Sequence, residues 1–216
     1  MKNLTLRDAT EVDAPIIAGL IYDTEETPDH IWGQGTKEEI LNRIQWLVLS
    51  QESRYSYLNI KVAELNGKTC GAIILLNSEE ISDLDTKTSF ELLHMIKGIK
   101  GKVKFIKDLI LGMYLKEGGD RELYIANLAT TKKVRGLGIG KELMKLAEKV
   151  AKEKGYKGCS LLAKDEKVRK FYENLDYKFE KEEKYFFHYM VFLILNTSLF
   201  LIYTLGILDL ILQRIS

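Results

Sequence analysis

A glycine-rich segment, residues 134–141, constrains this chain more than any other stretch. Its sequence is Val-Arg-Gly-Leu-Gly-Ile-Gly-Lys, and it lies between an apolar run at residues 123–129 and a stretch in which apolar residues recur at helical spacing. Glycines let a backbone approach a ligand closely, and the first N–H groups of a helix are unpaired at its positive dipole end. The pattern predicts a strand, an anion-binding turn and a helix that opens near Gly140.

Two common phosphate-binding loops do not match this segment. A Walker-type loop has a glycine five residues before its Gly-Lys pair and Ser or Thr after it, where this chain has Arg135 and Glu142. A dinucleotide-binding loop has a third glycine three residues after its Gly-x-Gly, where this chain has Lys141 or Leu143. Neither arrangement explains the anion site.

The spacing Arg-x-x-Gly-x-Gly, at Arg135, Gly138 and Gly140, resembles the pyrophosphate-binding loop of the GNAT-type N-acetyltransferase superfamily. A second segment, residues 165–177, reads Asp-Glu-Lys-Val-Arg-Lys-Phe-Tyr-Glu-Asn-Leu-Asp-Tyr and is similar to the family helix N-x-x-A-x-x-F-Y-E-x-L-G-F. A strand-like run at residues 159–163 separates the two segments in the order that the family has. The resemblance covers residues 3–194.

The implied fold class is α/β (α+β), with a central mixed, mostly antiparallel sheet flanked by helices. The residues agree: a strand at 4–7 precedes a helix through 16–21 that Thr10 and Asp13 would cap. Thr36 would cap a second helix over residues 36–49. The pair Asn66-Gly67 then predicts a tight hairpin between strands at 57–64 and 69–76.

Residues 82–121 depart from the family plan as a long insertion between the third and fourth strands. The insertion contains two helix-like pieces, at 89–96 and 103–115, around the basic, flexible segment 97–102. Connections of this length are usually functional. Two interpretations stay open: a lid over the acceptor side, and a solvated helical hairpin.

Composition sets the remaining bounds. A chain of 216 residues that is 46% hydrophobic can bury one core, which predicts one domain over residues 1–194. Its 32 basic and 31 acidic residues nearly cancel, so nucleic acid is not an expected partner. Charged residues interrupt any apolar leader near the start, which favours a cytoplasmic protein.

No metal site is expected, because the three histidines, His30, His94 and His188, are isolated in the sequence. The two cysteines, Cys70 and Cys159, are expected to be buried thiols.

The resemblance implies direct acetyl transfer from acetyl-CoA, as donor, to a primary amine of a small molecule or peptide. It also implies that backbone N–H groups near residues 128–130 stabilise the thioester oxygen and that Tyr172 is the general acid. The alternative for Tyr172 is an aromatic anchor beside Phe171. The cofactor-binding residues that the resemblance implies are Leu128, Ala129, Thr130, Arg135, Gly136, Leu137, Gly138, Ile139, Gly140, Lys141 and Asp165.

The general base is not identified by the sequence. Many family members have a Glu on the fourth strand where this chain has Ala126. Glu122 could act through water, and Glu25 or Glu26 could reach over from the acceptor side, or each could be an ordinary exposed carboxylate. Asp165 replaces the usual Asn and cannot donate an amide N–H, which predicts weaker cofactor binding. The alternative function is therefore a non-catalytic acyl-CoA-binding sensor.

The tail, residues 195–216, is the second departure. If a last strand forms at residues 188–194, the apolar remainder 199–212 would make a helix of about 21 Å, too short for a hydrocarbon core of about 30 Å. We therefore expect an extra apolar C-terminal helix that packs on its own domain or on a second copy in a homodimer. Membrane attachment is the alternative, in which Asp209 would be unfavourable near the bilayer centre.

Overall fold

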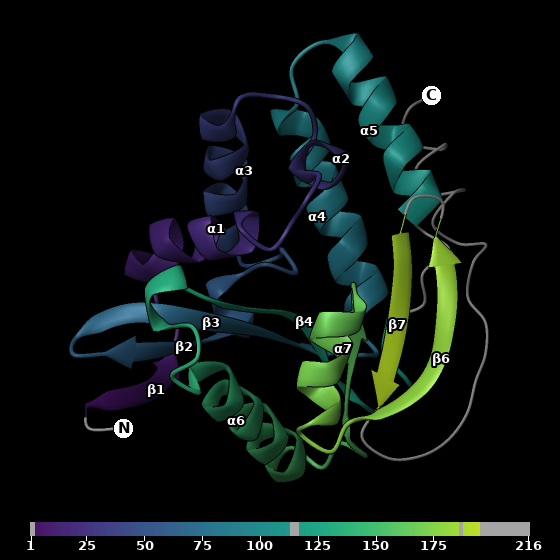
Figure 1. The fold of residues 1–216 in the computed structure, drawn as a ribbon. Helices are drawn as coiled ribbons and strands as arrows, with labels where there is room; N and C mark the ends of the chain where they lie inside the picture. The colour runs from purple at the N-terminus through teal and green to yellow at the C-terminus, as the bar shows by residue number, and fades with distance from the viewer. Residues whose placement is uncertain (1–2, 113–116, 186–187, 195–216) are drawn as a thin grey trace.

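The centre of the structure is a seven-stranded sheet with strand order β1-β2-β3-β4-β5-β7-β6 (Figure 1). The computed structural model describes residues 3–112, 117–185 and 188–194. Neighbouring strands are antiparallel except β4 and β5, which are parallel, so the expected mixed sheet is confirmed. The strands are β1 Leu4–Asp8, β2 Ile60–Leu65, β3 Lys68–Asn77, β4 Leu123–Thr130, β5 Cys159–Ala163, β6 Lys178–Tyr185 and β7 His188–Ile194.

Helices cover both faces of the sheet. The upper face in Figure 1 has α1 to α5, and the lower face has α6 and α7. Strand β3 is buried on both faces: Ile74 and Leu76 contribute to the upper core, while Ile73 and Leu75 contribute to the lower core. The helices are α1 Ala14–Tyr22, α2 Pro28–Trp32, α3 Lys37–Leu49, α4 Ile81–Met95, α5 Ile99–Gly112, α6 Ile139–Glu153 and α7 Glu166–Glu173.

Local sequence signals fix several of these elements. Thr36 accepts a hydrogen bond from the Glu39 N–H, and the Glu39 carboxylate accepts one from the Thr36 N–H, which completes the capping box of α3. Asn66 and Gly67 have φ of 52° and 73°, so the expected hairpin turn joins β2 to β3. Strand β2 begins only at Ile60, because the residues before it form a short 3-10 turn.

The start of α1 is held to the sheet by a charged anchor. Asp13 accepts two hydrogen bonds from the guanidinium of Arg7 on β1, at 2.8 and 2.9 Å, and one from the hydroxyl of Thr69 on β3 at 2.8 Å. The backbone N–H of Thr10 also donates to this carboxylate. These bonds, that from Arg7 above all, hold the pKa of Asp13 well below its usual range.

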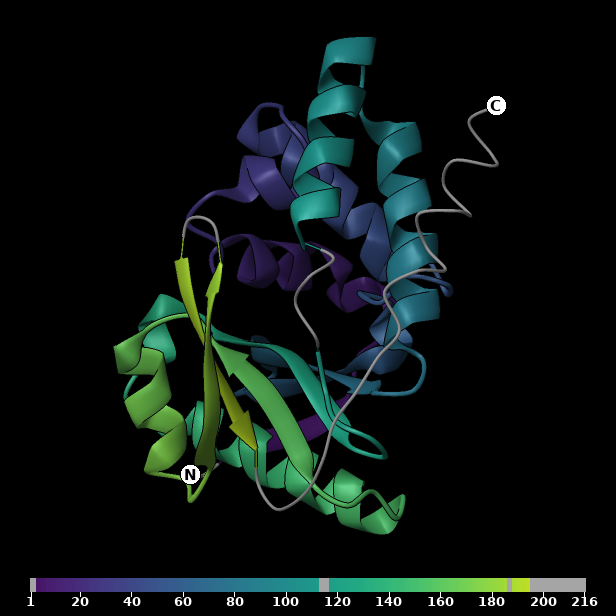
Figure 2. The ribbon, with the colours of Figure 1, turned by 90° about the vertical axis from the view of Figure 1, so that its right-hand side faces the viewer.

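The insertion is more helical and better packed than its sequence predicts. Helix α4 begins at Ile81, well before the expected residue 89. The sequence pattern is interrupted there because Thr88 takes an apolar position on the buried face of the helix. The Thr88 hydroxyl donates to the Leu84 carbonyl at 2.6 Å and accepts from the Arg54 N–H at 2.9 Å, so its burial is satisfied. Leu92 and Phe105 are buried in the upper core, so the insertion is not a hairpin standing apart from the domain (Figure 2).

The last described strand, β7, spans His188–Ile194, as predicted. It pairs with β5 and β6. The tail at residues 195–216, with its expected helix, homodimer and membrane alternatives, lies outside the described residues. Within the part of the chain that is described, every helix is too short or too polar to cross a bilayer.

Candidate active site

Strand β4 changes its neighbours halfway along its length. It pairs with β5 only from Leu123 to Ile125, whereas it pairs with β3 as far as Thr130. The register with β3 shifts between Ile125 and Asn127, which makes Ala126 the extra residue of a β-bulge. Beyond the bulge no described strand lies against the β5-facing edge of β4. Its backbone polar groups there need another partner, which a ligand can supply.

The glycine-rich loop follows β4 and leads directly into α6. Gly136 and Gly138 have φ of 82° and 79°, and a Cβ at either position would meet nothing within 4 Å. Gly138 is the N-cap of α6, and its carbonyl accepts the first helical hydrogen bond, from Glu142, at 3.1 Å. The backbone conformation, rather than a contact, favours glycine here. The first N–H groups of α6 have no acceptor within the helix, so they can bind an anion.

Exposed cations surround this loop. Arg135 and Lys141 belong to the predicted motif, and Lys132 and Lys133 form the turn just before it. All four side chains are exposed. Together with the dipole of α6, they favour a ligand that carries phosphate.

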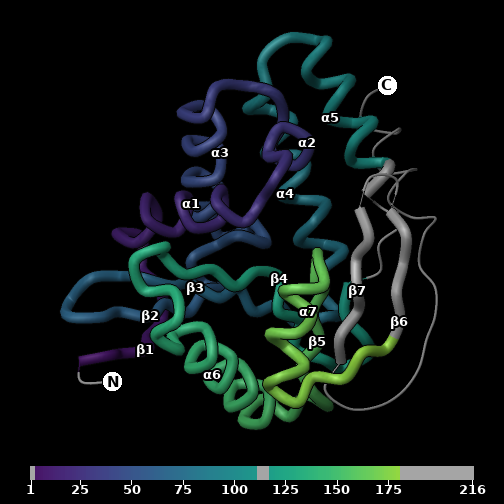
Figure 3. The backbone as a smooth tube through the Cα atoms, in the orientation of Figure 1, coloured from purple at the N-terminus to yellow at the C-terminus, as the bar shows by residue number. Residues whose placement is uncertain are grey.

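Three elements, namely β4, the glycine-rich loop and α7, meet at Gly140. A Cβ there would lie 3.4 Å from the ring of Phe171 on α7 and 4.0 Å from the side chain of Leu128 on β4. The Phe171 ring packs edge-on against Tyr172, with the ring centroids 5.1 Å apart. Helix α7 packs beside β5, as Figure 3 shows. The structure therefore brings together the loop, the part of β4 beyond the bulge and the aromatic pair of α7.

Tyr172 is only 7% exposed and lies in the lower core. Its ring is 5.9 Å from that of Tyr177, centroid to centroid. Burial raises the pKa of the Tyr172 phenol above its ordinary value, so the side chain is protonated at neutral pH, as a general acid must be. The same packing suits an aromatic anchor, so the catalytic role stays a prediction.

Two predicted carboxylates have other partners. Asp165 is the N-cap of α7 and accepts a hydrogen bond from the Val168 N–H at 2.7 Å, so it begins the helix that positions Tyr172. Its contact with a cofactor stays a prediction. Glu122 is 4% exposed and accepts from the Gly119 N–H at 2.8 Å. It precedes β4, a strand about 26 Å long, so the structure does not bring it together with the glycine-rich loop.

The loop between α1 and α2 reaches the point where β4 and β5 separate. Asn127, next to the bulge, donates from Nδ2 to Thr24 Oγ1 at 2.9 Å. Lys164, the residue after β5, donates from Nζ to the Thr24 carbonyl at 2.8 Å. The loop is thus fixed to both strands, on the sheet face opposite α6.

Glu25 follows Thr24 in this loop and is partly buried. Burial raises the pKa of the Glu25 carboxyl above its ordinary value, and the nearby Lys164 partly opposes this. Glu26 is exposed and lies 3.9 Å from Lys164. Of the two loop carboxylates considered from the sequence, Glu25 has the environment that favours holding a proton.

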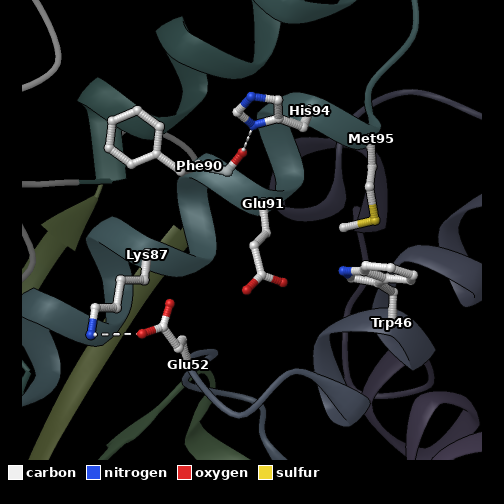
Figure 4. Close-up of a pocket in the computed structure, with 7 residues that line it drawn as sticks. All are labelled: Trp46, Glu52, Lys87, Phe90, Glu91, His94 and Met95. Atoms are coloured by element: carbon white, nitrogen blue, oxygen red, sulfur yellow. Dashed lines mark hydrogen bonds and ion pairs between the residues drawn. The ribbon is translucent and has the colours of Figure 1, made fainter. Parts of the chain in front are cut away.

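A cavity of about 500 Å³ lies elsewhere, between α3 and α4 on the upper face of the sheet (Figure 4). In Figure 4 the Glu91 carboxylate points between Trp46 and the ion pair of Lys87 with Glu52. No residue of the glycine-rich loop, of β4 or of α7 lines it. We therefore place the candidate site at the loop, where the anion-binding backbone is.

Sequence reasoning missed the roles of Thr24, Asn127 and Lys164. The hydrogen bonds of Thr24 reach partners 103 and 140 residues away. Neither residue type nor spacing marks such contacts, and the bulge that turns Asn127 toward the α1–α2 loop depends on pairing with β3.

The comparisons with known proteins agree with this arrangement. A model of the acetyltransferase (GNAT) family matches residues 20–177. A search of curated proteins finds no match. The fold is similar to that of an N-acetyltransferase from Staphylococcus aureus Mu50, with a TM-score of 0.70 and 21% identity over 88% of this chain and 100% of that one.

Two further structures share the fold at lower identity. A polyamine N-acetyltransferase from Drosophila melanogaster has a TM-score of 0.53 and 13% identity, over 90% of this chain and 100% of that one. A structure from Corynebacterium glutamicum described as "histone acetyltransferase HPA2 and related acetyltransferase" has a TM-score of 0.61 and 14% identity. The match covers 93% of this chain and 99% of that one. Since the family model spans most of the sequence and these structures share the fold, this chain belongs to the acetyltransferase (GNAT) family.

Proposed function

We propose that this protein transfers the acetyl group of acetyl-CoA to a primary amine of a small molecule or peptide. The observation that supports this most is the meeting, at Gly140, of an anion-binding loop, an unpaired strand edge and the helix that holds Tyr172. The residues present fit the donor, because Gly136 and Gly138 leave open space over a loop with exposed cations. Acetyl-CoA would supply the acetyl group as a thioester.

Each part of the site has a task in this reaction. The first N–H groups of α6, with Arg135 and Lys141, would bind the pyrophosphate. Backbone N–H groups of residues 128–130 would stabilise the negative charge on the reacting carbonyl oxygen, and Tyr172 would give its proton to the departing sulfur. An ammonium has no lone pair, and a lysine-like amine titrates near about 10.4, so the acceptor must lose a proton before attack.

The test is thiol release from acetyl-CoA in the presence of an amine panel. Because structures that share this fold include a polyamine N-acetyltransferase, the panel contains spermidine and agmatine beside a lysine peptide and a peptide with a free α-amine. Amine-dependent release of CoA thiol is the expected result. Reactions without amine give the background.

A second function, an acyl-CoA-binding sensor, is favoured by one observation: Ala126 at the bulge has no carboxylate. Calorimetric titration with CoA separates the two. Binding of CoA without turnover of any panel amine would contradict the enzyme and support the sensor, whereas absence of CoA binding would contradict both.

A further inference from the structure

Glu25 carries an inference that rests on the proposed acetyl transfer and adds a residue to it. We propose that Glu25, in the loop between α1 and α2, accepts the proton that the amine must lose before it attacks the thioester. Strand β4 has no carboxylate of its own, and Glu122 lies at the far end of that strand from the glycine-rich loop. The base must therefore come from another element that reaches β4.

The α1–α2 loop is that element. Thr24 is joined to Asn127 at the bulge and to Lys164 after β5, at 2.9 and 2.8 Å, so the next residue, Glu25, is held near Lys164, at the end of β5. The Thr24 hydroxyl lies 2.7 Å from the Ile21 carbonyl and 3.3 Å from Glu25 Oε1. Since a hydroxyl has one proton and the shorter contact is to Ile21, Glu25 keeps an oxygen that can accept another proton.

The charged and titratable groups that face Glu25 come from three elements. Lys164 follows β5, Glu26 is the next residue of the loop, and Tyr55 lies in the segment before β2. The pKa of Glu25 is raised chiefly by burial; Lys164 and the contact with the Thr24 hydroxyl oppose this, and Glu26 adds to it. A carboxyl with a raised pKa is a stronger base than an ordinary one, which suits proton removal near neutral pH.

The proton balance is complete without another reagent. The ammonium gives one proton to Glu25, which later passes it to water. The neutral nitrogen then forms a bond to the carbonyl carbon, and the carbon–sulfur bond breaks with its electron pair on sulfur. Tyr172 gives its proton to that sulfur, and the second proton lost by nitrogen restores Tyr172 through solvent.

The experiment compares Glu25→Gln with wild type, using the panel amine that wild type acetylates fastest. At neutral pH, kcat/KM should fall by about 10² to 10⁴, the usual contribution of a general base. The loss should shrink as pH approaches the pKa of the amine, about 10.4 for a lysine-like group, because solution then supplies the neutral amine. Affinity for CoA by calorimetry should not change. In carboxyl ¹³C NMR, wild type should show one glutamate signal that titrates with a raised pKa. That signal should be absent from Glu25→Gln.

Glu38→Gln is the matched control, since it neutralises an exposed carboxylate in the first turn of α3. It should keep wild-type turnover at every pH. Wild-type turnover by Glu25→Gln across the pH range would overturn the proposal, and so would a loss that appears in Glu26→Gln instead. If wild type binds CoA but acetylates no amine, the proposed function itself fails, which is a distinct result.

Discussion

The two sides of the candidate site are built in different ways. The donor side, which comprises residues 128–141 and α7, is mostly one continuous stretch of chain, and its proposed ligand-binding groups are backbone N–H groups. The acceptor side comprises the α1–α2 loop at residues 23–27, Asn127 and Lys164, and it depends on side-chain hydrogen bonds between distant residues. The donor side should therefore be altered by local backbone changes, and the acceptor side by loss of single tertiary contacts.

The largest expected effect is on the donor side. Gly138→Asp should abolish CoA binding in calorimetric titration, because it puts a carboxylate where phosphate is expected and because Gly138 has positive φ. Gly155→Asp is the matched control: Gly155, after α6, also has positive φ, 75°, with nothing within 4 Å of a Cβ. Both variants should lose similar stability, and only Gly138→Asp should lose CoA. Unchanged CoA affinity in folded Gly138→Asp would refute the loop assignment.

Tyr172→Phe should separate chemistry from binding on the donor side. The ring still packs beside Phe171 and Tyr177, so fold and CoA affinity should persist. Turnover should fall by about 10² to 10⁴ because the phenolic proton is gone. Steady-state kinetics with the best panel amine, together with calorimetry, provide the measurement. Wild-type turnover, with the chemical step shown to limit the rate, would leave Tyr172 as a packing residue only.

Asp13→Asn should weaken the helix that carries the acceptor-side loop and leave the donor side intact. Losing the charge-assisted bonds to Arg7, which is one-third exposed, should lower the free energy of unfolding by about 2 kcal/mol. Because folding lowers the pKa of Asp13, its stabilisation is present above the unfolded pKa of about 3.9 and is lost as pH falls below it.

Urea unfolding at several pH values measures this effect. Wild type should lose stability on acidification more steeply than Asp13→Asn, while CoA affinity at neutral pH should match in the two proteins. Equal slopes would show that the Arg7–Asp13 anchor contributes nothing to acid sensitivity. A parallel loss of CoA affinity would show that the two sides are not independent.

The smallest effect should come from the link between the sides. Thr24→Val leaves the Asn127 amide without its acceptor, and a hydrogen bond of about 1 kcal/mol corresponds to an about fivefold fall in kcat/KM. Thr24→Ser keeps the hydroxyl and should restore the rate. Combining Thr24→Val with Asn127→Ala should cost little more than either change alone. Additive losses would show that the two residues act separately.

The fold was predictable wherever the signal is local and repeated. The Thr36 capping box, the Asn66-Gly67 turn and the strand–loop–helix unit around Gly138 each depend on neighbours in sequence, and each forms as expected. The start of α4 was missed because buried Thr88 breaks the apolar periodicity; its hydroxyl is satisfied by the Leu84 carbonyl and by the N–H of Arg54, 34 residues away. Strand β6 was missed because its sequence, KFEKEEKY, is mostly charged.

The sequence by itself determined the strand, glycine-rich turn and helix start of the proposed donor side, since positive φ at glycine and unpaired N–H groups at a helix start are properties of a few consecutive residues. Only the tertiary structure decided that Ala126 is a bulge residue, that Glu122 lies far from the loop, and that Thr24 meets Asn127 and Lys164. Strand register, and contacts between residues more than a hundred positions apart, depend on strands and loops that pack together only in the folded protein. No short pattern encodes them.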